Sequence, residues 1–391
     1  MMPITVPKDI DKYFYNRKKD IKMIELQISS IYEDLPNQIL LTGKRGVGKT
    51  FLLKKILNDQ AEDILTLYID ISKIYGNNQK ISEEEILKSI LSETNNTLEK
   101  KGKLQKVKSS IDNIVQIMKL KEYDINDTTD IFNITLPKIK DNYPKLSEFV
   151  MELPQHIVDS SSDIEGVVIV IDEFQLIKNV NNPEAFFWLI RSYLQTQANV
   201  CYIFTGSVSK TAEIIEMLNG QTGAFGGRVL QIDIKPFSKK ETKNYIKEKL
   251  PKIKFTDEGF DRFYKCTNGI PAYINTFCNV LDSNELYDAQ KIKETFLLKM
   301  DQIVIMWLYV WGRLNMQEKE IIKCLVEHDE LTWTQLLEKC NFSKATLAKY
   351  IDSLNNQGMI KFTYENKYTL NDEMIRTWLK HKKETEGQYP I

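Results

Sequence analysis

The stretch that decides the fold is QILLTGKRGVGKT, residues 38–50. Its first residues are largely apolar and predict a short strand, and apolar residues at helical spacing follow Lys49. Between them, Gly43 to Thr50 fits the pattern G-x-x-x-x-G-K-[ST] without exception. Glycines let a backbone curl so that successive N–H groups point inward and form a nest for an anion. The stretch therefore predicts a strand, a phosphate-binding loop and a helix that begins at Lys49 and directs its positive end at the phosphates.

This loop predicts a nucleotide site. Lys49 is expected to reach the β and γ phosphates, and the Thr50 hydroxyl is expected to bind Mg²⁺. The guanine signature Asn-Lys-x-Asp is absent, because Tyr-Thr follows the only Asn-Lys pair, so ATP is favoured over GTP. The residues expected around the nucleotide phosphates are Gly43, Lys44, Arg45, Gly46, Val47, Gly48, Lys49, Thr50 and Phe51.

Other apolar segments predict the rest of a sheet. They span residues 64–72, 166–172, 199–207 and 228–234, and helical patterns separate them. Near-continuous apolar strands that alternate with helices are typical of a parallel sheet covered on both faces. We therefore predict an α/β P-loop fold, with the alternating segment 228–234 at an edge. Residues 12–35, before the loop, predict one helix.

Two carboxylates, Asp172 and Glu173, end the segment 166–172. Ligands of a parallel sheet lie beyond the carboxyl ends of its strands. Asp172 is therefore expected to hold Mg²⁺, directly or through water, and Glu173 to act as general base on the attacking water. The alternative is a strand-terminal aspartate that caps the next helix.

Polar residues beside the next two segments extend the candidate catalytic set. Thr205 or Ser207 is expected to orient the lytic water or contact the γ-phosphate, and the alternative is hydrogen bonding within a turn. Arg228 is expected to neutralise transition-state charge, in cis or toward a neighbouring subunit, unless it forms a surface salt bridge. The candidate catalytic residues are Lys49, Asp172, Glu173, Thr205 and Arg228, and the candidate metal ligands are Thr50 and Asp172.

Length and composition limit the classes of protein. The 391 residues suggest two to four domains at ~100–200 residues each. A net charge of −1 excludes a chain-wide basic coat for nucleic acid, although not a local basic patch. Five cysteines without a C-x-x-C pair, and no apolar signal region, indicate a reducing cytoplasm. The longest apolar run, 303–311, falls short of the ~20 residues that span a bilayer. It predicts a buried helix at a domain junction, with an interfacial membrane helix as the alternative.

The remaining sequence predicts an insertion, a helical region and a C-terminal module. The segment of about 76–160 exceeds an ordinary βα connection, and residues 238–301 have a purely helical pattern. We expect a P-loop ATPase domain at 1–235, a helical lid at 236–301 and a winged helix at 302–391. The insertion is expected to be helical, with Leu87, Ile90 and Leu91 on one helix and Leu104, Val107, Ile111, Ile114 and Ile117 on another.

The winged helix is predicted from three helical segments, 317–328, from 332 onward and 345–355, followed by a hairpin at 359–370. Ser343 suits the N-cap of the third helix. Exposed Lys344, Thr346 and Lys349 would enter a major groove, and Lys361 and Lys367 on the wing would meet phosphates. Asp352 and Glu365 would repel phosphate from this face, so two alternatives stay open: double-stranded DNA binding, or a winged helix that docks a protein or acts in autoinhibition.

Together these features resemble the archaeal ATPase family, within the signal-transducing and AAA+-related P-loop ATPases, over about residues 8–75 and 163–375. A C-terminal winged helix is usual in that family. The resemblance rests on Phe14-Tyr15-Asn16-Arg17, Gly43–Thr50, Ile171–Gln175, Thr205-Gly206-Ser207, Gly227-Arg228, Lys235–Ser238 and Asn268–Pro271.

By this resemblance, Asn16 and Arg17 would lie near the adenine or ribose, and Pro271 would start a lid helix near the base. No arginine occurs between Arg262 and Arg313, so the resemblance implies that the lid arginine that senses the γ-phosphate in many AAA+ enzymes is missing. This favours a switch in which nucleotide state repositions the lid and tail. The expected ligands are ATP or ADP with Mg²⁺.

Two hypotheses follow. The first is a cytoplasmic Mg²⁺-dependent ATPase whose winged helix binds double-stranded DNA. The second is a nucleotide-gated signalling switch whose winged helix and insertion bind protein partners. A membrane-peripheral ATPase that uses residues 303–311 is a weaker third reading, and an oligomer is compatible with all three.

Overall fold

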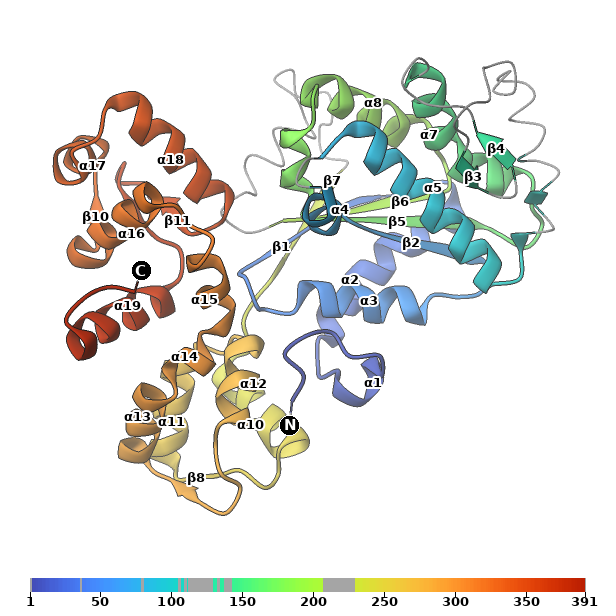
Figure 1. Ribbon diagram of the computed structural model, residues 1–391. Coiled ribbons are helices and arrows are strands. Elements are labelled where there is room, and N and C mark those ends of the chain that lie inside the picture. The colour runs from blue at the N-terminus through green and yellow to red at the C-terminus, as the bar shows by residue number, and fades with distance from the viewer. Residues whose placement is uncertain are drawn as a thin grey trace.

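The computed structural model describes residues 2–35, 37–78, 81–104, 107–108, 111, 129–131, 134–136, 143–206 and 229–390. A five-stranded sheet forms the centre of the N-terminal part (Figure 1), in the order β2-β5-β6-β1-β7. Every neighbouring pair is parallel, so the predicted α/β fold is confirmed, and the last strand lies at an edge as expected. The strands are β1 (Gln38–Gly43), β2 (Ile64–Asp70), β5 (Gly166–Asp172), β6 (Val200–Thr205) and β7 (Val229–Ile234).

Helices cover both faces of this sheet, because successive side chains of a strand point to opposite faces. Leu40 and Ile169 belong to the core on one face, and Leu41 and Val170 to the core on the other. Figure 1 shows α5, α7 and α8 on the first face and α2 and α3 on the second. These helices are α2 (Lys18–Ile28), α3 (Lys49–Asp59), α5 (Glu83–Lys100), α7 (Tyr143–Asp159) and α8 (Pro183–Thr196); α4 (Ile71–Asn78) and the 3₁₀ helix η4 (Phe174–Asn179) follow β2 and β5.

The predicted insertion supplies much of the first layer. Leu87, Ile90 and Leu91 are buried on α5, which begins with a capping box between Ser82 and Glu85. The region also contains an antiparallel pair, β3 (Thr129–Ile131) and β4 (Ile134–Leu136), so it is not wholly helical. Three residues are too few for a strand period to stand out in a sequence. Of the second expected helix, Leu104, Val107 and Ile111 are buried, and Ile114 and Ile117 lie outside the described residues.

The single helix expected over 12–35 is wrong. The chain forms α1 (Ile10–Tyr13), α2 and the 3₁₀ helix η1 (Ser29–Glu33). Asn16 and Arg17 interrupt it with φ of 60° and 65°, in the left-handed region. This conformation turns the Arg17 side chain onto distant carbonyls, and such long-range contacts override the local helical period.

The lid follows the sheet. Its region is helical as expected, except for a parallel pair of two-residue strands, β8 (Lys254–Phe255) and β9 (Leu286–Tyr287), which are too short for a sequence pattern. The apolar run continues as α15 (Ile305–Trp311), which lies between the lid and the C-terminal module in Figure 1. Its Trp307 and Trp311 are buried in a core that both parts share. The lid helices are α10 (Lys239–Lys249), α11 (Asp257–Thr267), α12 (Pro271–Asn279), α13 (Ala289–Leu298) and α14 (Met300–Ile303). In the described part of the chain, no helix has the length and apolarity to cross a membrane.

The C-terminal module is the predicted winged helix. Ser343 caps α18 by accepting a hydrogen bond from the N–H of Thr346. The sequence reading missed β10 and the long α19, whose Arg376 donates to carbonyls of Leu325, Val326 and Asp329 at the end of α16. The elements are α16 (Met316–His328), β10 (Glu330–Leu331), α17 (Trp333–Cys340), α18 (Lys344–Asn356), β11 (Ile360–Phe362), β12 (Tyr368–Leu370) and α19 (Glu373–Glu386).

Candidate nucleotide site

The glycine-rich loop has the backbone that an anion nest requires. Gly46 and Gly48 have φ of 80° and 96°, where side chains are strained, and α3 begins at Lys49 as predicted. The Lys49 ammonium donates to the Gly43 carbonyl at 2.8 Å, so its side chain folds back along the loop. The loop therefore presents a helix N-terminus and a lysine on the same side. Of the other expected loop residues, Lys44 and Arg45 are exposed and Val47 is buried.

Asp172 lies at the carboxyl end of β5, where residues of β2, of β6 and of the helix after the loop contact it. It ends β5 and is 5% exposed. The Thr50 hydroxyl donates to its Oδ2 at 3.1 Å, and the hydroxyls of Tyr68 and Thr205 also donate to this carboxylate. The two expected metal ligands, Thr50 and Asp172, are thus in direct contact. Burial and the Asp172 charge raise the pKa of Tyr68 above its usual value, which keeps its hydroxyl a proton donor.

Glu173 is held in an unusual backbone conformation beside this carboxylate. Its φ is 57°, and its N–H donates to the Thr205 hydroxyl at 3.0 Å and to Asp172 at 3.1 Å. Its side chain accepts a hydrogen bond from the Gln175 amide. Burial, and then the Asp172 charge, raise the pKa of Glu173, while Lys49 opposes that shift. The arrangement places a carboxylate with elevated proton affinity near the phosphate loop, as a general base requires.

Opposing effects act on the charge of Lys49 in this site. Burial lowers the pKa of Lys49, and the carboxylates of Glu173 and Asp172 counter that shift. A polyphosphate beside Lys49 would favour its charged form further. Within the described residues, the buried Oε1 of Gln175 has no hydrogen-bond partner. A buried acceptor of this kind, on the residue that hydrogen-bonds Glu173, is compatible with a site that takes up Mg²⁺ and water.

The N-terminal segment joins the loop to the lid. Arg17 donates to the carbonyls of Val47 and Lys235 at 2.9 and 2.7 Å. Its guanidinium lies over the Phe237 ring at 4.7 Å. Asn16 donates to Glu241 of α10 at 2.6 Å. The residues expected near the base therefore lie at the junction of loop, β7 and lid.

Two aromatic rings and the start of α12 border the loop on other sides. Phe51, on α3, packs edge-to-face against Phe14 with ring centres 5.6 Å apart. Pro271 is the first residue of α12, as expected, and the next residue, Ala272, donates its N–H to the Gly46 carbonyl at 3.1 Å. A Cβ on Gly46 would come within 2.8 Å of the Ala272 Cβ, so the lid helix contacts the loop directly.

A chain of polar contacts extends from the loop to the winged helix. The Arg45 guanidinium lies over the Trp307 ring, 5.4 Å from its centre. The Trp307 indole N–H donates to the Tyr273 hydroxyl and, at 3.2 Å, to Asp372. Tyr273 in turn donates to Asp372 at 2.6 Å, and Asp372 caps α19. Residues of the loop, the lid, α15 and the winged helix therefore share one network.

Most residues of this site were predicted from the sequence, but the roles of Tyr68 and Gln175 were not. Tyr68 was not expected, because its contact with Asp172 depends on β2 lying next to β5, and strand order has no local signature. Gln175 belongs to the stretch Ile171–Gln175 on which the family resemblance rests, but it was given no role. Its position two residues after Glu173 was the sequence feature that could have indicated their contact. Arg228 and Ser207 lie outside the described residues.

The expected nucleic-acid face is only partly available. Lys344 and Lys349 are exposed on α18, Thr346 is half-buried, and Lys361 is exposed on the wing. Lys367, however, is paired with Glu365 at 2.7 Å and with Glu330 at 3.7 Å. Of the residues expected to meet DNA, the lysines that stay exposed without an ion pair of this kind are therefore Lys344 and Lys349 of α18 and Lys361 of the wing.

Comparisons with known proteins identify the family of this chain and its fold. A family model described as an ATPase domain predominantly from Archaea matches residues 14–277, and one described as winged helix-turn-helix DNA-binding matches residues 314–361. No curated protein matches the sequence significantly. Among solved structures, the chain is similar to the Walker-type ATPase of Pyrococcus abyssi, with 16% identity, 95% of this chain and 97% of that chain covered, and a TM-score of 0.62. It is also similar to the ORC2 protein of Aeropyrum pernix, solved as ADPNP and ADP complexes, with 9% identity, 96% of each chain covered and a TM-score of 0.50. At such identities the likeness shows a shared fold.

Proposed function

Because the chain belongs to the family of ATPase domains found predominantly in Archaea, we propose that it hydrolyses ATP with Mg²⁺ and that its nucleotide state controls double-stranded DNA binding by the winged helix. The observation that carries this proposal is the contact of Thr50 and Thr205 with Asp172, next to Glu173 and the phosphate loop. We further propose that the units are the ATPase domain at 1–235, the lid at 236–301 and the winged helix at 302–391.

The donor set suits Mg²⁺. This ion prefers oxygen ligands and usually keeps several waters while it contacts one or two protein groups and the phosphates. The Thr50 hydroxyl and the Asp172 carboxylate supply oxygens of this kind, 3.1 Å apart. When bound, the ion neutralises negative charge on the phosphate oxygens. Tyr68 and Thr205 hold the Asp172 carboxylate in place for this contact.

Glu173 is the proposed base. Its carboxylate accepts the proton of the attacking water, while Lys49 and the loop N–H groups bind the phosphates. Thr205 contacts both carboxylate residues, so we assign it the positioning of Asp172 and Glu173. Arg228 remains our candidate for neutralising transition-state charge. Asn16, Arg17 and Pro271 remain candidates for the adenine or ribose side, since Arg17 contacts Val47 of the loop and the residue after Pro271 contacts Gly46. Phe51, which packs against Phe14, remains a candidate for the phosphate side.

The contacts between loop and winged helix support nucleotide control. Nucleotide binding at residues 43–50 acts on Arg45 and on the Gly46 carbonyl, and both contact the C-terminal half through Trp307 and Ala272. The lid and winged helix share one continuous hydrophobic core, so a shift of α12 or α15 is passed to the winged helix. A ligand changes DNA affinity only by its differential interaction with the two states, typically ~1–3 kcal/mol.

A phosphate-release assay on the full chain, with and without duplex DNA, tests this proposal. We expect Mg²⁺-dependent release that DNA changes, and DNA affinity that differs between ATP-bound and ADP-bound protein. Lys49→Ala should remove nucleotide binding or turnover. Lys240→Ala, at an exposed lysine of α10, is the matched control and should leave both unchanged. Absence of ATP hydrolysis with and without DNA would refute the enzymatic part.

The second candidate is a nucleotide-gated switch that binds protein partners through the winged helix and the insertion. The wing favours it, since Phe362 and Tyr364 are exposed there while Lys367 is neutralised by acidic partners. Duplex DNA binding at ~50 mM salt, where phosphate contacts are strong, distinguishes the two. No detectable binding under that condition would leave the protein-binding switch.

A further inference from the structure

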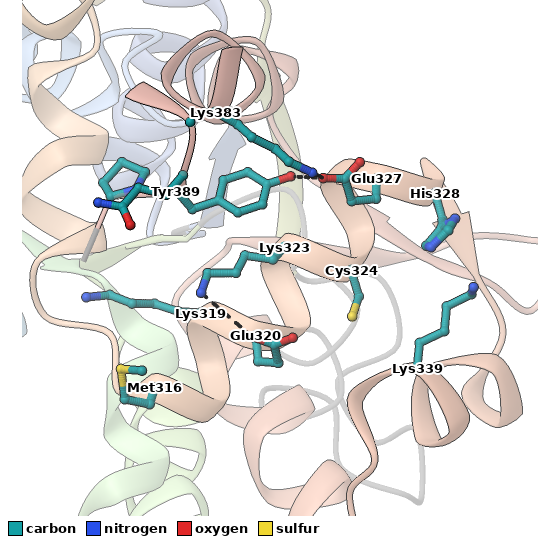
Figure 2. Close-up of a pocket in the computed structure, with 13 residues that line it drawn as sticks. Met316, Lys319, Glu320, Lys323, Cys324, Glu327, His328, Lys339, Lys383 and Tyr389 are labelled. Atoms are coloured by element: carbon teal, nitrogen blue, oxygen red, sulfur yellow. Dashed lines mark hydrogen bonds and ion pairs between the residues drawn. The ribbon is translucent and has the colours of Figure 1, made fainter. Parts of the chain in front are cut away.

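A cavity of about 680 Å³ lies on the side of the winged helix formed by α16, α17 and the C-terminal residues 387–390. The C-terminal residues that line the cavity are held in place by hydrogen bonds. Tyr389 and Lys383 both contact Glu327, and the Trp311 indole donates to the Pro390 carbonyl at 3.2 Å. Figure 2 shows Cys324 on its wall, between Lys323 of the same helix and Lys339 of α17. Neither the proposed ATPase site nor the DNA-binding face uses this cavity.

A second thiol lies directly behind Cys324. Cys340, the last residue of α17, donates its S–H to the Cys324 sulfur with a sulfur–sulfur distance of 3.4 Å. Cys340 is 7% exposed, whereas Cys324 is half-buried and reaches the cavity. A disulfide needs sulfurs ~2.05 Å apart, so the two must approach by somewhat more than 1 Å. Cys340 is the last residue of α17, and Asn341 leaves the helix with φ of 52°, so this thiol lies at a helix end, where the backbone frays.

The surroundings give the two thiols different reactivity. The hydrogen bond from Cys340 lowers the pKa of Cys324. Lys339 adds to this shift, while burial and the charges of Glu320 and Glu327 oppose it. The same hydrogen bond, together with burial, raises the pKa of Cys340. Since the thiolate is the nucleophile in thiol exchange, Cys324 is the group that reacts first with a molecule in the cavity.

We propose that Cys324 and Cys340 form a dithiol modification site that small disulfides oxidise to an intramolecular disulfide. The Cys324 thiolate attacks one sulfur of the small disulfide, which gives a mixed disulfide and releases one thiolate. Cys340 then loses its proton to that thiolate and attacks the Cys324 sulfur, which expels the second thiolate. Two protein thiols are oxidised, one small disulfide is reduced to two thiols, and the new bond joins α16 to α17.

The test uses the full chain and oxidised glutathione as the probe. After incubation, free thiols are blocked with N-ethylmaleimide, counted in denaturant and located by peptide mass spectrometry. We expect a fall from five free thiols to three and a cross-link between Cys324 and Cys340. Cys340→Ser should instead accumulate a glutathionyl group on Cys324. Cys266→Ser, at a half-buried thiol elsewhere, should keep the cross-link.

A measurement on the unsubstituted chain guards against variants that fold poorly. In the native reduced protein, iodoacetamide should alkylate Cys324 at least tenfold faster than Cys340. The proposal is overturned if all five thiols stay free in oxidised glutathione, if the cross-link joins other cysteines, or if Cys340 is alkylated as fast as Cys324.

Discussion

Replacing Tyr273 with phenylalanine removes one hydroxyl from the contact between lid and winged helix. That hydroxyl is buried and donates to the Asp372 carboxylate at 2.6 Å. A hydrogen bond to a charged group contributes ~1.5–3 kcal/mol net. Asp372 keeps the Trp307 N–H at 3.2 Å and its capping bond from the Met374 N–H at 2.8 Å, so the helix cap survives.

The expected effect is a local loosening of this contact. Amide hydrogen exchange in α15 and the first turn of α19 should accelerate about 10- to 150-fold, which corresponds to ~1.5–3 kcal/mol of opening free energy. Asp372→Asn, which retains an acceptor for the cap, should give a similar acceleration. If the two side chains act through one contact, the double variant should exchange little faster than the more affected single variant.

A matched lid tyrosine provides the control. Tyr245 donates to Asn275 within the lid, so Tyr245→Phe should leave exchange in α19 unchanged. Strictly additive effects of Tyr273→Phe and Asp372→Asn would show that the two groups are not coupled. Unchanged exchange in both single variants would refute the inference that this contact holds the winged helix to the lid.

Tyr68→Phe should lower the rate of ATP hydrolysis about tenfold, measured as phosphate release at saturating Mg²⁺, because Asp172 loses a donor worth ~1.5 kcal/mol. Arg376→Met should destabilise the winged helix by about 3 kcal/mol in urea denaturation, because it leaves three carbonyls at the end of α16 without this donor; an unchanged midpoint would contradict that reason. Lys344→Ala and Lys349→Ala should each weaken duplex binding and reduce the slope of log affinity against log salt by about 0.9. An unchanged slope would remove these lysines from the DNA interface.

The phosphate loop was predictable because its determinants are local. Glycine conformations, the position of Lys49 and the start of α3 all follow from a few consecutive residues. Asp172 and Glu173 were predictable for a related reason, since a strand that is apolar throughout ends in two carboxylates. Local sequence does not encode which other strands bring hydrogen-bond donors to these two carboxylates. The contact of Tyr68 with Asp172 therefore became visible only once the structure gave the strand order β2-β5-β6.

The interrupted N-terminal helix shows how distant contacts override a local period. Residues 18–33 keep the apolar spacing, and Ile24 and Ile28 are buried, but Leu26 is 65% exposed. The break at Arg17 is set by carbonyls 30 and 218 positions away in the sequence. The network of Tyr273, Trp307 and Asp372 has the same origin, since no short motif links residues so far apart.

The central claim is that the site beside the phosphate loop hydrolyses ATP with Glu173 as the base. Its most direct test compares ATP binding and phosphate release in the unsubstituted chain and in Glu173→Gln, which keeps the size of the side chain but removes the base. We predict unchanged ATP affinity and a hydrolysis rate lower by ~10²–10⁴. Turnover by Glu173→Gln at the rate of the unsubstituted chain would contradict the account.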